Sequence, residues 1–327
     1  MAKTPIDLAV LMPVFEDRES ASRLVSELAA GARRPYIVVV EDGSRTPMTA
    51  ADLERAGAEG AVIHLARNMG HQRAIAAGLS YVAAHFDPAA VVVMDSDGED
   101  VPDVVPSLLE GLRAGDADVV VAKRRQRSES LRFRAFYSVY RRLFRLLTGR
   151  KIRFGNFSAL TGRAVRRLAA MQETWVHYPA SIIVSRLKVA AVPADRGSRY
   201  AGESRMNLVS LCLHGMRSMM VLAEDVLMRV GLFAVTLICG AAGLLVVAAI
   251  LKLVGWATPG WFSTAAGLLV IILLQAGILS FVTLMIAGVV RSAAPIRASD
   301  LDAIIDRVEF TQGAAVPAAV PAEARAA

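Results

Sequence analysis

Cysteine and histidine are scarce in this chain of 327 residues, which has two cysteines and five histidines. Cys212 and Cys239 both lie in apolar surroundings and lack the spacing of a metal site or a disulfide framework. We expect two small buried side chains in a reducing compartment. The histidines show no pairing at metal-ligand or triad spacing, and no G-x-S-x-G elbow or Walker A loop occurs. The sequence therefore offers no pattern for a zinc site, a serine nucleophile or a P-loop.

A signal peptide is also missing, because residues 1–7 are short and polar and are followed by a predicted core strand. We therefore expect the bulk of the chain to begin in the cytoplasm. Hydrophobic residues make up 54% of the chain and the mean hydropathy is +0.44. Both values are high for a soluble protein and indicate a membrane segment.

Positive charge is concentrated in one stretch, although the net charge of the whole chain is +7. Residues 123–153 contain twelve lysines and arginines against Glu129 alone. The remainder of the chain is therefore net acidic, and a single basic patch needs an explanation.

Short aliphatic runs alternate with helical patterns in the first part of the chain. Predicted strands cover 8–12, 37–40, 62–65 and 91–94, and helices such as 20–30 and 72–84 separate them. Continuous apolar runs are typical of strands buried on both faces, so we expect a parallel sheet with helices on both sides. Polar residues follow each strand, where open α/β sheets bind their ligands.

Two long uncharged runs in the second part of the chain predict a transmembrane hairpin. Residues 230–251 and 261–290 each exceed the roughly 20 residues that a bilayer requires. Trp256 and Trp261 lie at the intervening loop, as interfacial aromatics do, and Lys252 is its only basic residue. Arginines 217 and 229 precede the pair, and 291 and 297 follow it, so the positive-inside rule places both ends in the cytoplasm.

The segment VVVMDSDGEDVPD at 91–103 carries the most specific chemical signal. Asp95 and Asp97 follow a buried strand with one residue between them. Where the chain turns, two such carboxylates can converge on Mg²⁺ or Mn²⁺, hard cations that typically bridge to substrate phosphates. Glu99 is a candidate third ligand.

Four motifs occur in an order that resembles family 2 glycosyltransferases: VLMPVFED (10–17), VVVEDGS (38–44), LARNMGHQRAIAAGL (65–79) and MDSDGEDVP (94–102). The nearest branch is the dolichol-phosphate mannosyltransferase and bactoprenol glucosyltransferase type. The resemblance covers roughly the first 225 residues and extends to the two-helix membrane region. It implies a Rossmann-like nucleotide-sugar fold of the GT-A type.

The resemblance also implies roles for individual residues at the donor. Pro13 and Glu16 would lie at the nucleotide, and Asp42 would read the base or ribose. The nucleotide pocket would be shaped by Arg67, Asn68 and Gly70, and the metal on the donor pyrophosphate would be held by Asp95 and Asp97. Taken singly, a turn at Asp42-Gly43 or a helix cap at Asn68 explains these residues equally well; their order favours the functional interpretation.

Two further segments bear on the acceptor. In RFGNFSALTGRAV (153–165), Asn156 stands where members of this branch often have Asp, which puts a carboxylate base there in doubt. A lipid phosphate is already anionic near neutral pH, so Asn156 could orient it by hydrogen bonds, or merely cap a turn. The loop 195–206 resembles the Arg-rich loop of the family, with Arg199, Ser204 and Arg205 as candidate phosphate contacts.

Two amphipathic segments complete the prediction. The basic helix 133–151 is typical of a membrane-surface element, and nucleic-acid binding is the rival that the hairpin disfavours. Residues 206–223 could lie on the membrane or form an ordinary core helix.

We predict four regions: a cytoplasmic glycosyltransferase domain at 1–205, an interfacial helix at 206–228, a transmembrane hairpin at 229–291 and a partly disordered cytoplasmic tail at 292–327. The expected reaction is inverting transfer of a sugar from a UDP- or GDP-sugar to polyprenyl phosphate at the cytoplasmic face of the plasma membrane, for the cell envelope, with Asp97, Asn156 and Arg205 in catalytic roles. The alternatives are a processive polysaccharide synthase, which would carry Gln-x-x-Arg-Trp and more membrane helices, and an inactive adaptor, which intact Asp95 and Asp97 disfavour. A homo-oligomer is left open.

Overall fold

The computed structural model describes residues 3–124, 142–150, 154–201, 208–256, 258–292, 301 and 303–317. The chain divides into two compact units. The first comprises Met1–Glu129, Ile152–Val221 and Pro295–Ala327, and the second comprises Ser130–Lys151 and Leu222–Ala294.

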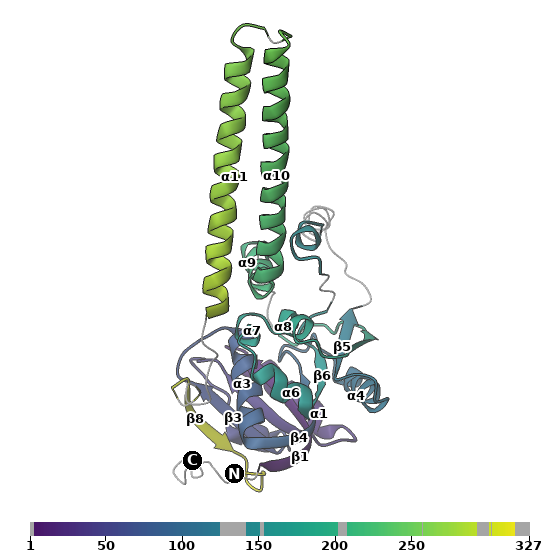
Figure 1. Ribbon diagram of the computed structural model, residues 1–327. Helices are drawn as coiled ribbons and strands as arrows, with labels where there is room; N and C mark the ends of the chain where they lie inside the picture. The colour runs from purple at the N-terminus through teal and green to yellow at the C-terminus, as the bar shows by residue number, and fades with distance from the viewer. Residues whose placement is uncertain are drawn as a thin grey trace. The chain divides into compact units, whose positions relative to one another are not determined.

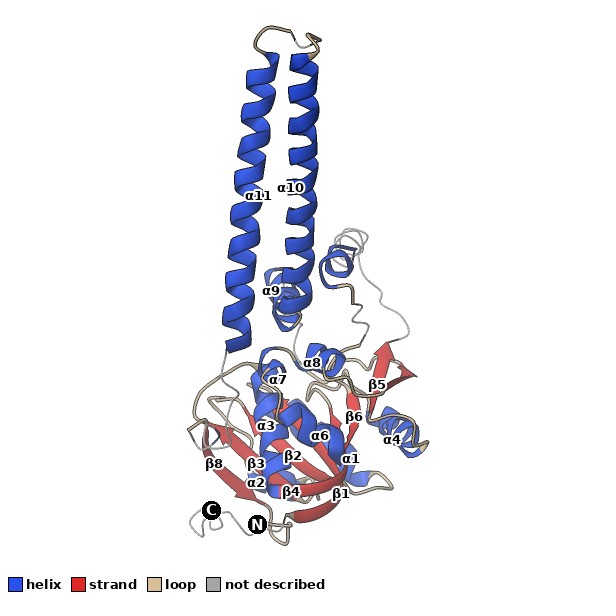
Figure 2. Cartoon of the chain, in the orientation of Figure 1, coloured by secondary structure: helices blue, strands red, loops and turns tan. Residues whose placement is uncertain are grey.

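The first unit alternates strands and helices along the chain (Figures 1 and 2). Its first half contains β1 (Thr4–Val14), α1 (Arg18–Ala30), β2 (Tyr36–Glu41), α2 (Ala50–Arg55), β3 (Gly60–Leu65), α3 (His71–His85), β4 (Phe86–Val93), a 3-10 turn (Pro102–Val104), α4 (Val105–Arg113) and β5 (Val119–Arg124). Then follow β6 (Ser158–Thr161), α6 (Gly162–Ala169), α7 (Glu173–Val176), α8 (Tyr178–Val184), β7 (Val189–Ala194) and α9 (Leu208–Val221), with β8 (Ile305–Phe310) near the end of the chain. All four predicted strands and both predicted helices are confirmed within a few residues.

The sheet has eight strands in the order β7-β5-β6-β4-β1-β2-β3-β8. The four strands predicted from the sequence are parallel, with β1 between β4 and β2 and with β3 beside β2. The expectation of a purely parallel sheet is wrong at the flanks, because β6 runs antiparallel to β4 and β5, and β8 runs antiparallel to β3. The sheet is therefore mixed, with a parallel centre.

Helices cover both faces of the sheet, as the sequence predicts. Strand residues alternate between two buried clusters: Leu11 faces the cluster that contains Ile75 and Leu79 of α3, and Met12 faces the one that contains Leu24 of α1. Gly78 of α3 lies directly against the sheet, since a Cβ there would meet the Leu11 side chain at 2.6 Å. This close packing fixes the start of α3 beside the carboxyl ends of the strands.

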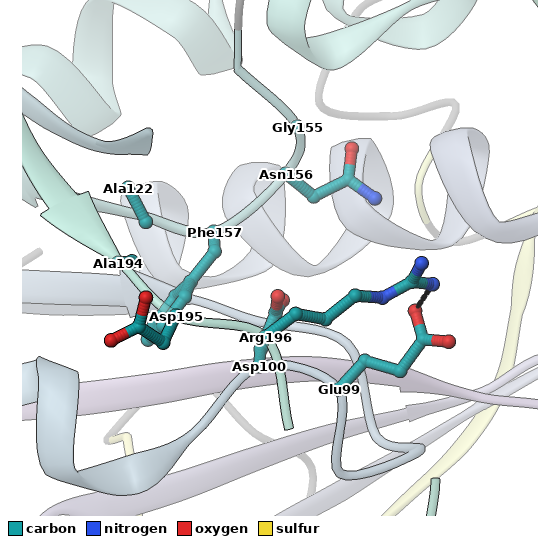
Figure 3. Close-up of a pocket in the computed structure, with 9 residues that line it drawn as sticks. All are labelled: Glu99, Asp100, Ala122, Gly155, Asn156, Phe157, Ala194, Asp195 and Arg196. Atoms are coloured by element: carbon teal, nitrogen blue, oxygen red, sulfur yellow. Dashed lines mark hydrogen bonds and ion pairs between the residues drawn. The ribbon is translucent and has the colours of Figure 1, made fainter. Parts of the chain in front are cut away.

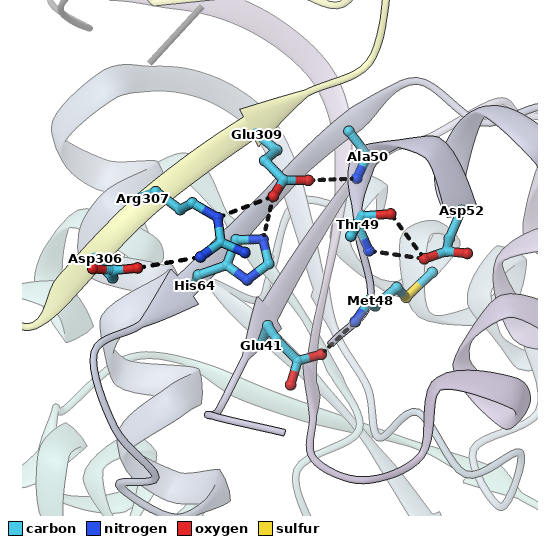
Figure 4. A network of polar contacts seen from close by, with 9 residues as sticks. All are labelled: Glu41, Met48, Thr49, Ala50, Asp52, His64, Asp306, Arg307 and Glu309. Atoms are coloured by element: carbon cyan, nitrogen blue, oxygen red, sulfur yellow. Dashed lines mark hydrogen bonds and ion pairs between the residues drawn. The ribbon is translucent and has the colours of Figure 1, made fainter. Parts of the chain in front are cut away.

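The strand β8 comes from the region predicted as a tail, where the sequence predicts no strand. Its Glu309 accepts a hydrogen bond from the Ala50 N–H at 3.0 Å and one from Arg307 at 3.1 Å (Figure 4). Nε2 of His64 lies 3.1 Å from Oε1 of Glu309 without forming a hydrogen bond. Burial lowers the pKa of His64, and the Arg307 charge lowers it further.

The chain beyond β8 continues this packing. Gly60 donates to Thr311 Oγ1 at 3.0 Å, and Tyr36 donates to the Ala315 carbonyl at 3.0 Å. Part of the region predicted as a partly disordered tail, residues 303–317, thus packs on the first unit, and 318–327 lie outside the described residues.

The second unit contains two long helices, α10 (Ala223–Leu253) and α11 (Trp261–Ser292), joined by a short turn. Both are long and apolar enough to cross a membrane, with few of their residues buried inside the protein. Ala234, Ala241 and Ala248 are the buried residues of α10. Their spacing of seven places small side chains on one stripe, which lets the two helices pack closely (Figure 1). The expected burial of Cys239 is wrong, because this side chain of α10 is exposed.

The predicted helix boundaries need one adjustment. The helix α9 ends at Val221, and α10 begins at Ala223, seven residues before the predicted span at 230. The predicted interfacial helix 206–228 is thus divided between α9 and the first turns of α10. Of the basic helix 133–151, only residues 142–150 are described.

Candidate active site

The candidate site lies where the parallel strands end, as predicted. Loops leave β1, β2, β3 and β4 at the same edge of the sheet, because parallel strands share their carboxyl ends. These loops carry most of the residues that the sequence singled out.

The Asp-x-Asp turn directly follows β4. Oδ2 of the buried Asp100 accepts the Asp95 N–H at 3.0 Å, and Oδ1 of Asp97 accepts the Glu99 N–H at 3.0 Å. Gly98 has φ +85, a conformation that side chains disfavour. The turn is therefore closed by its own carboxylates, with Asp95 and Asp97 only partly exposed.

Asn156 meets this turn from the loop before β6. Its Nδ2 donates to Oδ1 of Asp95 at 3.0 Å, and its Oδ1 accepts from Nε2 of Gln72 at 3.0 Å. Gln72 in turn accepts the backbone N–H of Tyr178 at 2.5 Å. Four residues far apart in the sequence thus form one continuous hydrogen-bonded chain.

A second segment covers the turn from the other side. Arg199 joins the two acidic side chains, because Nη2 lies 2.8 Å from Asp97 Oδ2 and Nε lies 3.0 Å from Glu99 Oε1. Arg196 also pairs with Glu99. The ring of Tyr200 packs against Gly98, where a Cβ would approach it to 2.6 Å.

The electrostatics of Asp97 follow from this environment. Burial raises the pKa of Asp97, and the neighbouring charge of Asp95 raises it further. The guanidinium of Arg199 opposes the shift. Cations in the site therefore stabilise the ionised form of Asp97 against burial.

Asp42, at the end of β2, anchors the loop after β3. Its oxygens accept the N–H groups of Met69 at 2.7 Å and Gly70 at 2.8 Å. Burial raises the pKa of Asp42, while these two hydrogen bonds lower it. The carboxylate thus shapes the segment that contains Arg67 and Asn68, both of them exposed.

The loop after β2 is held by two further acids. The buried Glu41 accepts hydrogen bonds from Ser44 N–H at 3.1 Å and Met48 N–H at 2.9 Å. Glu16 has φ 51, donates its N–H to Ser44 Oγ at 2.8 Å and accepts the Arg45 N–H at 2.9 Å. Their contacts connect the ends of β1 and β2.

A hollow next to these loops is drawn in Figure 3, in which Arg196 and Glu99 point toward each other. Its lining comes from the Asp-x-Asp turn, β5, the loop before β6 and the end of β7. The residues are Glu99, Asp100, Ala122, Gly155, Asn156, Phe157, Ala194, Asp195 and Arg196.

Residues 9–175, just over half of the chain, match the family model described as "Glycosyl transferase family 2". The chain belongs to glycosyl transferase family 2. The resemblance inferred from the four motifs is confirmed, and so is the α/β fold class.

Curated relatives of this family 2 chain include sugar transferases whose names contain undecaprenyl phosphate or bactoprenol. It is 28% identical over 216 residues to an undecaprenyl-phosphate 4-deoxy-4-formamido-L-arabinose transferase from Sodalis glossinidius, covering 62% of this chain and 64% of that protein. It is 26% identical over 244 residues to the bactoprenol glucosyl transferase of Shigella phage SfV, covering 70% and 77%. The chain thus spans less than two thirds of the length of the arabinose transferase.

Among solved structures, glucosyl-3-phosphoglycerate synthase from Mycobacterium tuberculosis, in complex with Mn²⁺ and UDP-glucose, is similar with a TM-score of 0.49 and 18% identity. The match covers 68% of this chain and 79% of that one.

The carboxylates of this family 2 site are the candidate ligands for the divalent cation expected from the sequence. Within the described residues, no cluster of three or more His, Cys, Asp or Glu side chains is arranged to hold a metal ion. Mg²⁺ and Mn²⁺ commonly use one or two carboxylates and take further oxygens from substrate phosphates. Asp95 and Asp97 supply two such carboxylates. Arg199 pairs with both Asp97 and Glu99, and Glu99 also pairs with Arg196, which makes Glu99 the poorer candidate for a third ligand.

The structure brings most of the predicted site residues to one edge of the sheet. Pro13 is buried near the end of β1, and Glu16 and Asp42 follow the strands. Arg199 reaches the Asp-x-Asp turn, and Ser204 and Arg205 lie outside the described residues.

Sequence reasoning missed Gln72, Tyr178 and Asp100. Gln72 lies in the motif at 65–79. As a polar residue in a largely apolar helix, it carries a signal that sequence reasoning could have used. Tyr178 contributes through its backbone N–H, which no sequence pattern marks.

Proposed function

We propose that this chain transfers a sugar from a nucleoside-diphosphate sugar to a polyprenyl phosphate at the cytoplasmic face of a membrane. Family membership supports glycosyl transfer, and the named acceptors of the curated relatives support a lipid phosphate. The observation that carries the proposal is an Asp-x-Asp turn at the ends of the parallel strands in a chain that also has two membrane-length apolar helices.

The donor side of the site would be formed by the loops after β1 to β4. Arg67 and Asn68 are exposed on a segment that Asp42 holds in place, which suits contacts to the nucleotide. Asp95 and Asp97 would hold Mg²⁺ or Mn²⁺ on the pyrophosphate. A divalent cation there would offset the negative charge that develops on the departing nucleoside diphosphate.

The chemical step would be a single in-line displacement. An oxygen of the lipid phosphate forms a bond to the anomeric carbon as the bond from that carbon to the pyrophosphate breaks. The lipid phosphate is already anionic near neutral pH, since the second pKa of a phosphomonoester is about 6. Positioning and charge balance therefore matter more than deprotonation, which agrees with an amide at Asn156.

The acceptor side would use the loop 195–206 and the membrane surface. The polyprenyl chain stays in the bilayer, so its phosphate must reach the site from the membrane side. Arg199, with Ser204 and Arg205, would supply contacts to that phosphate, and the basic stretch at 123–153 would favour anionic lipids at about 1 kcal/mol for each basic residue near the surface.

Lipid extraction after labelling tests the proposal. Membranes containing the chain are incubated with radiolabelled UDP- and GDP-sugars and polyprenyl phosphate, and the organic phase is analysed. We expect label in a lipid product that appears only with the active chain. Label that stays in water for every donor would refute the proposal, and a long water-insoluble polymer would favour a processive synthase.

A further inference from the structure

The hydrogen-bonded chain from Tyr178 to Asp95 has only one possible direction. A backbone N–H can only donate, so the atom of Gln72 that faces Tyr178 must be the carbonyl oxygen. The other end of the Gln72 amide is therefore an NH₂ group, and it can only donate to Asn156. This fixes the oxygen of Asn156 toward Gln72 and leaves its NH₂ group facing Asp95.

Two members of this hydrogen-bonded relay, Gln72 and Tyr178, lie in buried parts of helices, whereas Asn156 and Asp95 lie in loops at the site. Gln72 is 3% exposed and lies in the first turn of α3, and Tyr178 is fully buried at the start of α8. Ser158 of β6 donates to the Asn156 backbone carbonyl at 2.9 Å, and its hydroxyl lies 2.7 Å from that of Tyr178. Asn156 is thus positioned from three separate elements.

The relay also determines how Asp95 presents its carboxylate. Oδ1 accepts from Asn156, and the Asp95 N–H is bound by Asp100. Within the described part of the chain, Oδ2 of Asp95 has no hydrogen-bond partner. Oδ1 is therefore held by a hydrogen bond, and Oδ2 remains for a ligand.

We propose that Gln72 is a positioning residue of the donor site, which acts through Asn156 to orient Asp95 toward the nucleoside-diphosphate sugar and its divalent cation. An amide is the residue type that this relay needs at position 156. A carboxylate there could accept from Gln72 but, when ionised, could not donate to Asp95 and would repel it. The presence of Asn rather than the common Asp at position 156 therefore suits its neighbours Gln72 and Asp95 in this chain. The inference rests on the proposed function.

Gln72→Glu separates the two halves of the Gln72 amide. The variant keeps an acceptor for the Tyr178 N–H but has no NH₂ group for Asn156. The Asn156 amide would then turn its NH₂ toward the introduced carboxylate and its oxygen toward Asp95. We expect a 10- to 100-fold fall in kcat/KM for the donor, since small misplacements in an active site cost up to about 100-fold.

The experiment is a double-mutant cycle on the full chain in detergent, comparing wild type, Gln72→Glu, Asn156→Ala and the double variant. Gln172→Glu is the matched control, because it adds the same charge at an exposed position of the same unit. Each protein is assayed for transfer and for binding of UDP and GDP with Mn²⁺ by calorimetry. If Gln72→Glu fails to fold, Gln72→Met replaces it in the same cycle.

Coupling between the two positions is the expected result. The double variant should be no worse than Asn156→Ala, since Gln72 acts through Asn156. Additive losses, or a Gln72→Glu variant that behaves like Gln172→Glu, would overturn the inference. If wild type makes no sugar-lipid, the proposed function fails separately, while coupling in Mn²⁺-dependent nucleotide binding still decides on the relay.

Discussion

The side-chain amide of Asn156 donates a 3.0 Å hydrogen bond to the carboxylate of Asp95, which brings the loop before β6 against the turn after β4. The two residues are 61 positions apart. This contact joins a residue expected at the acceptor to one expected at the donor. The effects of substitutions at the two sides can therefore be compared with each other.

Replacing Asp97 by Ala should abolish transfer and leave the protein folded. The substitution removes one hard oxygen ligand and the charge that a cation on the pyrophosphate needs, so we expect a loss of at least about 100-fold in kcat. Transfer assays with thermal unfolding measure both effects. The exposed Asp116→Ala is the control, and full activity in Asp97→Ala or in excess EDTA would rule out the metal assignment.

Asp42→Asn should loosen the nucleotide loop. One of the two oxygens that accept the Met69 and Gly70 N–H groups becomes an NH₂ group, which leaves a buried donor facing another donor. Such a mismatch costs about 1–3 kcal/mol. We expect lower stability in denaturant unfolding and a higher donor KM with an unchanged acceptor KM; an unaltered donor KM would show that the loop does not contact the nucleotide.

Arg199→Lys tests which substrate the loop 195–206 serves. Lysine keeps the charge but cannot bridge Asp97 and Glu99 through two nitrogens. If Arg199 contacts the lipid phosphate, the acceptor KM should rise about 10-fold and nucleotide affinity should change little. The opposite pattern, weaker nucleotide binding with normal acceptor use, would place Arg199 on the donor side. Arg163→Lys, at an exposed position, is the control.

Glu309→Gln should weaken the attachment of β8, because it removes the negative charge of the carboxylate that accepts hydrogen bonds from the Ala50 N–H and from Arg307. Burial raises the pKa of Glu309, but these hydrogen bonds outweigh it and hold the pKa below the ordinary value of 4.5. A carboxylate whose pKa is lowered by folding stabilises the folded state fully at pH values above its unfolded-state pKa. This stabilisation is lost as the pH falls through its folded-state pKa.

Hydrogen exchange of the β3 and β8 amides measures this attachment. The difference between wild type and Glu309→Gln, about 1 kcal/mol in opening free energy, should be present at neutral pH. It should decline once the pH falls below about 4.5, the ordinary value, and vanish below the lower pKa of the folded state. A difference that does not decline below pH 4.5 would mean that the Glu309 charge is not responsible. Asp306→Asn, whose side chain is 58% exposed, is the control.

The product should be a β-linked lipid phosphosugar when the donor is α-linked. A single in-line displacement inverts the anomeric carbon, whereas a double displacement would retain its configuration. Nuclear magnetic resonance of the anomeric centre measures the outcome. A retained configuration, or a trapped glycosyl-enzyme, would require a different mechanism.

The local features of this protein can be predicted from short stretches of its sequence. Continuous apolar runs predicted β1 to β4, because strands buried on both faces have no polar side to show. Uncharged runs of membrane length predicted α10 and α11, and the spacing of Asp95 and Asp97 after a strand predicted the acidic turn. Each of these signals lies within a short stretch of chain.

Tertiary structure alone decided the contacts between distant stretches. No local pattern shows that β8 pairs with β3, since 240 residues separate Leu65 from its partner Ile305 and an unpaired strand edge can accept any matching backbone. The same holds for Gln72, whose amide is oriented by a backbone N–H of α8. A backbone group has the same chemistry at every residue, so only its position in the fold could assign it a partner.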